Sequence, residues 1–284
     1  LKQNTQNLYC LQQEVDLVPF IHITDLHLSH SDLKDPNLHS DTESTLREII
    51  KAISSIKAMP KFVVLSGDLT NTGNLKSYEL LKQLLKMIPV PIILAIGNHD
   101  NRENFYKVFK NKTSSDPYFH DDVYSGLHVI TLDSSIPGRI AGEICDNQFK
   151  YLEVTLTKFG SIPKLLVLHH PPKMDPNGLP WGSLSMESTI KLENTLKRKN
   201  IVGILAGHIH INRVNSWNGI PVCISNGLHS SVDILETENL RIMEGSSFSI
   251  CVLRDCGLSV SYVPVTPKQK ELGIIDQKRL RKFS

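Results

Sequence analysis

The 284-residue sequence has little of what would assign it to several broad classes of protein. Its five cysteines are scattered and form no C-x-x-C pair, which disfavours a disulfide framework and a zinc ribbon and fits a reducing, cytoplasmic compartment. No stretch approaches the roughly 18 uninterrupted apolar residues of a membrane-spanning helix. The N-terminal stretch LKQNTQNLYC also lacks the apolar core of a signal peptide.

Net charge and aromatic content are low as well. The formal net charge is +2 with both signs interspersed, so no global field favours nucleic acid or a membrane as an obligatory partner. Only 6% of the residues are aromatic, which argues against a nuclease groove with stacking side chains. We therefore expect a small-molecule partner, a single domain over residues 1–264, and a solvated basic tail over 265–284, with partner binding as the alternative for the tail.

Five short apolar runs are present, and each predicts a buried strand: 20–23, 62–65, 92–96, 165–168 and 201–205. Amphipathic patterns between them predict helices at 41–58, 75–88 and 147–159, the last with Asp146 as N-cap. Alternating strands and helices indicate an α/β fold. Turns at Asn218-Gly219 and at Asp255 to Gly257 predict antiparallel strands, which we expect to form a second sheet packed on the first, flanked by helices.

Metal-ligand side chains follow every apolar run, in the stretches TDLH, SGDL, GNHD, HHPP and GHIH. Loops at the carboxyl ends of strands place side chains from distant parts of a chain around one crevice. Each stretch alone is compatible with ordinary loop polarity, but chance does not account for all five in order. The converging set is Asp25, His27, Asp68, Asn98, His169, His208 and His210.

This donor set predicts two metal ions rather than one. Seven ligands of this kind suit two divalent cations about 3.5–4 Å apart that share one carboxylate. Nitrogen and oxygen donors without thiolates favour Mn²⁺, iron, Co²⁺ or Zn²⁺, with Mn²⁺ preferred here, over Mg²⁺ or Ca²⁺. Two carboxylates and a bridging hydroxide leave about one positive charge, which a phosphodiester monoanion would neutralise.

The order D-x-H, G-D, G-N-H-D, H and G-H-x-H resembles the calcineurin-like metallophosphoesterase superfamily. The stretches 97–105, 130–156, 165–172 and 216–225 resemble its class III cyclic nucleotide phosphodiesterase branch, and the resemblance covers roughly residues 18–235. It implies a four-layer αββα sandwich of two mixed sheets, hydrolysis of phosphodiesters such as 3′,5′-cyclic AMP, and a homodimer. By this resemblance one ion takes Asp25, His27 and His210, the other takes Asn98, His169 and His208, and Asp68 bridges them.

The resemblance also implies roles outside the ligand set. His99 faces the substrate and assists departure of the leaving group after attack by a metal-bridging hydroxide. The H-x-P pattern selects His169 over His170, which is then a surface residue or one that supports a ligand. His229 lies where the family often places residues near the substrate, although an exposed loop histidine is the alternative.

The residues themselves leave further alternatives open. Asp100 either orients the imidazole of His99 or caps the helix that follows. Arg102 either approaches phosphate or forms an ion pair on that helix. Asp133 is expected to be a buried hydrogen-bonding carboxylate, and Trp181 either walls the site or packs in the core.

Rival functions differ in substrate or in class. The same chemistry could act on a nucleotide-linked lipid pyrophosphate or on a glycerophosphodiester. A non-catalytic interaction module on this fold would usually lack ligands, and none is missing here.

Overall fold

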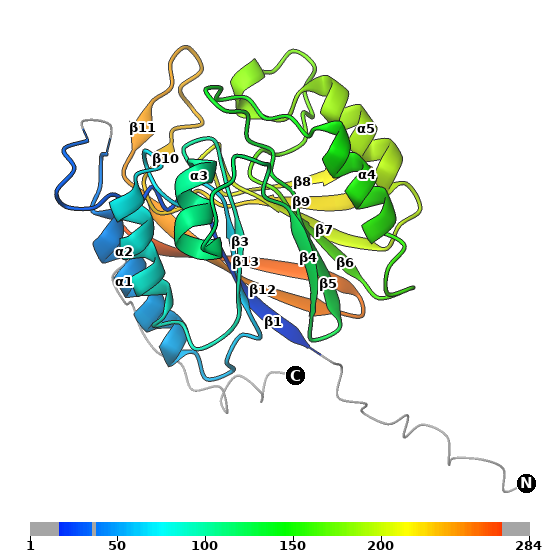
Figure 1. Ribbon diagram of the computed structural model, residues 1–284, viewed down its shortest axis with the longest axis horizontal. Helices are drawn as coiled ribbons and strands as arrows, with labels where there is room; N and C mark the ends of the chain where they lie inside the picture. Colours follow the sequence, from blue (N-terminus) through cyan, green and yellow to red (C-terminus); the bar gives the residue numbers. More distant parts are fainter. Residues whose placement is uncertain (1–16, 36–37, 269–284) are drawn as a thin grey trace, which may run out of the picture.

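The computed structural model describes residues 17–35 and 38–268 (Figure 1). One sheet has five strands in the order β13-β12-β1-β2-β3. Its strands are β1 (Val18–Ile23), β2 (Val63–Ser66), β3 (Ile92–Ala95), β12 (Ser246–Arg254) and β13 (Gly257–Thr266). The other sheet has six strands in the order β4-β5-β6-β7-β9-β8. Its strands are β4 (His120–Tyr124), β5 (Leu127–Thr131), β6 (Lys164–Val167), β7 (Ile201–Ala206), β8 (Arg213–Trp217) and β9 (Ile220–Ile224).

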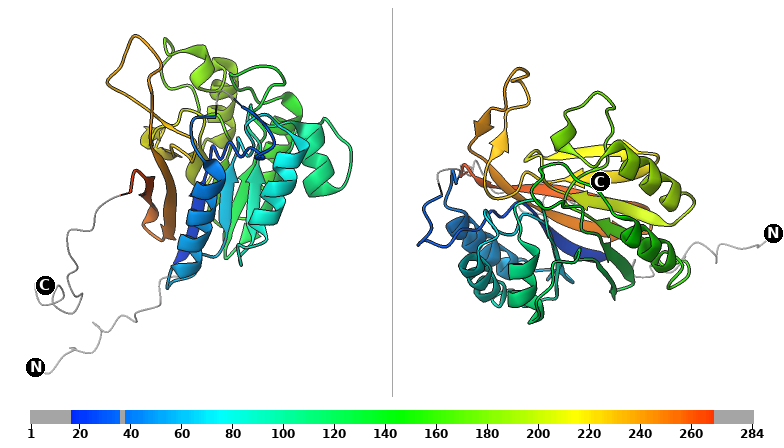
Figure 2. Two further views of the ribbon diagram at one scale, coloured as in Figure 1. Left: turned by 90° about the vertical axis from the view of Figure 1, so that its left-hand side faces the viewer. Right: turned by 45° about the horizontal axis from the view of Figure 1, so that its top comes forward.

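Helices cover the outer face of each sheet, as the two views of Figure 2 show. The helices are α1 (Thr42–Ser55), α2 (Leu75–Leu85), α3 (Arg102–Phe105), α4 (Asp146–Thr155) and α5 (Met186–Leu196), with a π-helical turn at Tyr106–Lys110 and a 3-10 turn at Pro180–Gly182. A two-stranded hairpin, β10 (Ser231–Val232) and β11 (Ile242–Met243), projects from the body. No helix in the described part of the chain is long and apolar enough to cross a bilayer.

Three apolar layers hold the sandwich together. In β2, Val63 and Leu65 pack under α1 and α2, whereas Val64 between them faces the other sheet. The middle layer joins the two sheets through residues such as Phe20 and Leu165, and a third layer lies under α4 and α5. Strands covered on both faces need apolar residues at successive positions, which explains the unbroken runs in the sequence. The predicted α/β fold with two mixed sheets flanked by helices is confirmed.

The antiparallel strands are placed differently from our prediction. They do not build a sheet of their own: β9 extends the sheet of β6 and β7, and β12 pairs with β1. The predicted hairpin turn is correct, because Asn218 and Gly219 have φ values of 52° and 82°, the left-handed pair that a two-residue hairpin loop requires.

Some predicted boundaries are also corrected. Asp146 is the first residue of α4 and does not cap it; Cys145 occupies the cap position, and the Asp146 carboxylate pairs with Lys191. Helix α5, whose N-cap Ser185 accepts a hydrogen bond from Ser188, was not predicted. The predicted tail begins inside β13, and residues 269–284 of it lie outside the described residues.

Parallel strands from both sheets end at the same side of the sandwich. β1, β2 and β3 run parallel in one sheet, and β6 and β7 run parallel in the other. Backbone hydrogen bonds link the loops that follow them, including Asp25 N to Gly67 O at 3.1 Å within one sheet and Gly207 N to His169 O at 3.0 Å within the other. The five predicted ligand-bearing loops therefore share one end of the molecule.

Candidate functional site

Five of the predicted ligands have a left-handed backbone. Asp25, His27, Asp68, His208 and His210 have φ values of 47°, 44°, 48°, 75° and 50°. Side chains other than glycine rarely adopt this region, although Asp and His tolerate it better than most. Such conformations persist where the surrounding structure enforces them, and they gather at functional sites.

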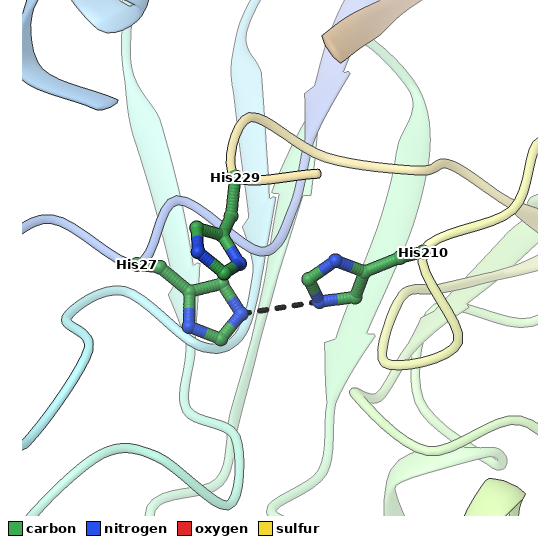
Figure 3. Close-up of side chains that lie close together, drawn as sticks. All are labelled: His27, His210 and His229. Atoms are coloured by element: carbon green, nitrogen blue, oxygen red, sulfur yellow. Dashed lines mark hydrogen bonds between the residues drawn. The ribbon is translucent and has the colours of Figure 1, made fainter. Parts of the chain in front are cut away.

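The side chains of three of these residues converge on one point. Nε2 of His27 lies 3.2 Å from Nε2 of His210 (Figure 3). The same nitrogen of His210 lies 3.3 Å from Oδ1 of Asp25. Donors bound about 2.1 Å from one ion, at tetrahedral or right angles, lie about 3.0–3.4 Å apart. The third distance, between Nε2 of His27 and Oδ1 of Asp25, is wider at 3.9 Å. Two of the three distances thus match the spacing of ligands of a single cation, and the third atom pair is close enough to flank the same ion.

His169 and Asn98 supply further donor atoms near Asp68. Nε2 of His169 is 3.1 Å from Oδ2 of Asp68 but lacks hydrogen-bond geometry, and Nε2 of His27 is 3.6 Å from the same oxygen. His169 Nε2 and Asn98 Oδ1 are buried without a hydrogen-bond partner. Buried polar atoms nearly always have a partner, so these two orphaned atoms fit a bound cation.

Each of the four predicted histidine ligands has one ring nitrogen engaged with an oxygen. The pairs are His27 Nδ1 with Asn71 Oδ1 at 2.8 Å, His169 Nδ1 with Ser66 O at 3.1 Å, His208 Nε2 with Trp181 O at 2.6 Å and His210 Nδ1 with Ser230 O at 3.1 Å. The engaged nitrogen carries the proton, and the other nitrogen keeps a lone pair. Supporting bonds of this kind orient histidine ligands of metal ions.

His170 is also near this cluster, but both of its nitrogens are engaged. Nδ1 lies 2.8 Å from Ser134 Oγ, and Nε2 lies 2.8 Å from the carbonyl oxygen of Ile140. The residue is fully buried, so the surface alternative is wrong. With no lone pair left for an ion, His170 supports the loop that presents His169.

Burial and mutual proximity set the charges of the donors. Burial alone would raise the pKa of Asp25, but the adjacent His210 lowers it below its usual value. The pKa of Asp68 is likewise held well below its usual value by His169, against the effect of burial. Burial lowers the pKa of His27 to about 3 and that of His208 to about 4. Against the effect of burial, the neighbouring carboxylates raise the pKa of His169 to about 9 and hold the pKa of His210 above its usual value. Two carboxylate anions beside imidazoles whose protons a bound cation would displace are a donor set for cations.

Comparison with known proteins agrees with this geometry. The family model for calcineurin-like phosphoesterases matches residues 18–212. The chain belongs to the calcineurin-like phosphoesterase family. A relative from Rhodococcus erythropolis, named a probable cyclic nucleotide phosphodiesterase, is 33% identical over 75% of this chain and 72% of its own length. Another, from Arcobacter nitrofigilis and named a probable glycerophosphodiester phosphodiesterase, is 30% identical over 64% of this chain and 68% of its own length.

Among solved structures, a dimetal phosphatase from Danio rerio has a TM-score of 0.65 at 14% identity, covering 86% of this chain and 95% of that one, and it supports the fold. This calcineurin-like phosphoesterase is a metal-dependent phosphoester hydrolase, and its family uses a dinuclear metal centre.

In this phosphoesterase, the backbone at Gly207 of the GHIH stretch lies so close to the loop after β1 that a side chain would not fit. A Cβ at Gly207 would lie 2.0 Å from the Thr24 hydroxyl and 2.3 Å from Oδ2 of Asp25. The backbone N–H of His208 donates to both carboxylate oxygens of Asp25 at 3.0 Å. The loop after β7 thus lies directly against the loop after β1, and only glycine leaves room for the carboxylate.

His99 lines the same cavity as the predicted ligands. Its side chain is exposed, its ring contacts His27 edge-on at 4.6 Å, and its Nδ1 lies 2.8 Å from the carbonyl oxygen of Asn71. Asn71 therefore fixes two imidazoles at once, through its side chain on His27 and its backbone on His99. Asn71 was not predicted, and its place three residues after Asp68 is the only signal of it in the sequence.

Both readings of Asp100 are wrong. Asn101, not Asp100, caps α3, and the Nδ1 of His99 bonds to Asn71. The buried Asp100 carboxylate instead accepts hydrogen bonds from the backbone of Leu69, Thr70 and Gly97 and from the hydroxyl of Tyr78. Burial, followed by the charge of Asp68, raises the pKa of Asp100 to about 6. Asp100 joins the loop that carries Asp68 to the loop that carries Asn98.

Arg102 forms an ion pair, but not within its own helix. Its Nε donates to Oδ2 of Asp133 at 2.9 Å, and a terminal nitrogen donates to the carbonyl oxygen of Ser135 at 2.9 Å. Asp133 is fully buried and also accepts from the backbone N–H of Tyr118, which confirms its predicted role. Arg102 is thus engaged with the loop after β5.

His229 is buried beside the cluster, so the exposed-loop alternative is wrong. Its ring lies 4.8 Å from that of His27 and 5.8 Å from that of His210 (Figure 3). Its Nε2 accepts a hydrogen bond from the backbone of His39, whose ring stacks on it. The structure therefore brings His229 to the site, as the resemblance implied.

A cavity of about 430 Å³ opens over these residues. Five of the seven predicted ligands, all except Asp25 and His169, line it together with His99, and Trp181 with aliphatic side chains forms its wall. Trp181 is half-buried. Its carbonyl oxygen contacts Nε2 of His208, and the centroids of the two rings lie 6.0 Å apart. The wall alternative is therefore the one that the structure supports.

Proposed function

We propose that this phosphoesterase is a binuclear-metal phosphodiesterase that hydrolyses small phosphodiesters, with 3′,5′-cyclic nucleotides such as cAMP as the first candidates. The observation that carries the proposal is that the predicted ligands near Asp68 have donor atoms without a hydrogen-bond partner, while the opposite nitrogen of each histidine ring is held by an oxygen. Four histidines present one lone pair each, and two buried donor atoms lack any other partner. The name of the Rhodococcus relative supports the choice of substrate.

The ligand assignment is part of the proposal. Asp25, His27 and His210 would hold one ion, Asn98, His169 and His208 would hold the other, and Asp68 would contact both. The spacing of the first group and the two orphaned atoms of the second support this division. Nitrogen and oxygen donors favour Mn²⁺, with iron, Zn²⁺ or Co²⁺ as alternatives.

Charge balance supports a monoanionic substrate. Two carboxylates do not neutralise two divalent cations, and an imidazole bound to a metal is neutral, so the loaded site would keep positive charge for a phosphodiester. When bound, such ions supply Lewis acidity at phosphorus and lower the pKa of coordinated water.

The side chains around the ions orient the substrate and handle its protons. The Nδ1–H of His99 donates to the Asn71 carbonyl oxygen, which fixes the ring and leaves Nε2 free. In the imidazolium form, Nε2 also carries a proton, and it gives this proton to the departing alkoxide. Such general-acid help contributes about 10²–10⁴-fold in rate. Asp100 affects the site only by joining the loops that carry Asp68 and Asn98. Arg102 is held away from the substrate by its ion pair with Asp133. His229 forms part of the wall next to His27.

A glycerophosphodiester is the second candidate substrate, because the Arcobacter relative carries that name. The homodimer implied by the resemblance and the cytoplasmic location stay predictions, and sedimentation of the metal-loaded protein measures the former.

Two variants and a substrate panel test the proposal. Asn98→Ala should lose one ion per chain and all turnover, whereas His99→Ala should keep both ions and lose about 10²-fold or more in kcat. Metal content is measured by mass spectrometry. Turnover with Mn²⁺ is measured on cAMP, cGMP, 2′,3′-cyclic nucleotides, glycerophosphodiesters and nucleotide-linked lipids. Full activity of Asn98→Ala without the second ion would refute the ligand assignment, and no hydrolysis of any diester would refute the function.

A further inference from the structure

Exposed apolar side chains are concentrated at the mouth of the site. Among the described residues, sixteen large hydrophobic side chains are exposed. We call the cavity of about 430 Å³ over the predicted ligands the metal cavity. Six of the exposed side chains line this cavity or the groove beside it: Ile140, Met174, Leu179, Ile234, Leu240 and Ile242. Soluble monomers rarely gather exposed apolar groups in this way unless the surface binds something.

The groove, which we call the side groove, has a volume of about 650 Å³. It lies between the 171–183 segment and the 232–240 segment, which includes the loop of the β10–β11 hairpin; both project from the same end of the molecule (Figures 1 and 2). Trp181, Ile209, Val232 and Leu240 line both the side groove and the metal cavity. The two spaces therefore adjoin along these four side chains.

The walls of the side groove suit an aliphatic ligand. Leu179 and Ile234 come from opposite segments and are 66% and 63% exposed. Several charged side chains also line it, but local bonds already occupy four of them. Lys173 donates to the Gly178 carbonyl, Asp175 accepts from Asn177, Asp233 pairs with Arg241, and Glu236 accepts from Asn239.

Because the side groove adjoins the cavity over the predicted ligands, we propose a further activity: the site also hydrolyses phosphodiesters that carry a linear alkyl or acyl chain, and the chain lies in the side groove. The inference rests on the proposed phosphodiesterase function. Water adds to phosphorus, the P–O bond to the leaving alcohol breaks, and the alcohol departs with a proton. The products are the alcohol and a phosphomonoester that keeps the chain.

A homologous substrate series tests this activity. Ethyl, butyl and octyl 4-nitrophenyl phosphate release the same chromophore and differ only in the retained chain. With the Mn²⁺-loaded protein, and below the concentration at which the octyl ester forms micelles, we expect KM to fall about two- to fourfold for each methylene that enters the groove. The octyl ester should thus have a KM at least about tenfold below that of the ethyl ester.

Variants on the two walls locate the effect. Leu179→Ser and Ile234→Ser should each reduce the ratio of ethyl to octyl KM by about threefold or more. Val154→Ser is the matched control, because Val154 is also 63% exposed but lies on α4, outside the side groove. All three changes are at exposed positions, and thermal denaturation verifies that each variant is folded.

The outcomes separate this inference from the proposed function. Equal KM values for the ethyl and octyl esters, or an equal effect of Val154→Ser, would overturn the side-groove inference while leaving phosphodiesterase activity intact. Loss of the proposed function would show instead as no hydrolysis of any ester, including bis(4-nitrophenyl) phosphate. In that case calorimetry with octyl phosphate and inorganic phosphate decides whether the groove binds a chain: tighter binding of octyl phosphate supports it, and equal binding excludes it.

Discussion

Asp100 offers a sharp test, because its carboxylate is the only acceptor that the structure shows for several buried donors. Asp100→Ala leaves three backbone N–H groups and the Tyr78 hydroxyl without this acceptor. A buried donor left unsatisfied costs roughly 1–3 kcal/mol, and water entering the void recovers part of that. We therefore expect the free energy of unfolding to fall by about 3–5 kcal/mol.

The same change should weaken the metal site. The donors come from the loops that carry Asp68 and Asn98, so losing the carboxylate separates a proposed shared ligand from a ligand of the second ion. Urea unfolding with and without Mn²⁺ measures the stability, and mass spectrometry measures the metal content. Asp122→Ala, at an exposed aspartate, is the control and should change the stability by less than about 0.5 kcal/mol. Equal urea midpoints for the two variants, or two ions bound by Asp100→Ala, would refute the reasoning.

Three further outcomes follow from the same geometry. His169→Gln should bind one ion fewer, whereas His170→Gln should keep both ions with about 1–3 kcal/mol less stability, as metal content and urea unfolding will show. Gly207→Ala should displace the Asp25 carboxylate and abolish turnover, which an unchanged kcat would contradict. Asp121→Asn removes the negative charge and one of the two oxygens that accept from three side chains, and it should cost about 1–3 kcal/mol at pH 7. Because its folded pKa lies below the usual 3.8, this contribution is present above that value and lost as pH falls through the folded pKa, so the two proteins should converge in acid.

The strands could be predicted from the sequence because their composition depends on burial alone. All five apolar runs are strands, since residues such as Val63 and Val64 must be apolar when helices cover one face and a second sheet covers the other. The pairing of strands could not be predicted in this way. Which sheet β12 joins depends on contacts between Val18 and Leu253, some 235 positions apart, and no local pattern records them.

The same contrast holds at the site. Donor types and their order after the strands are local properties, so Asn98 and His169 could be named in advance. The partners that orient the histidines could not, because Ser66 holds His169 and Trp181 holds His208 through backbone carbonyl oxygens that any residue type would supply. Asp100 was misread for a similar reason: its place before a helix predicts a cap, whereas its actual partners lie some 30 residues earlier in the chain.

The left-handed backbone of five predicted ligands limits which residue types can occupy the metal-binding loops. Each such residue costs roughly 1–2 kcal/mol relative to an ordinary backbone, so the set stores several kcal/mol in the loops. Hydrogen bonds across the two sheets, such as the one from His208 to Asp25, hold these loops in place. Metal binding would repay the strain, because ions that bind only the folded site stabilise it by mass action. The donors must therefore be residue types that both bind metal and tolerate this backbone, and Asp and His satisfy both conditions.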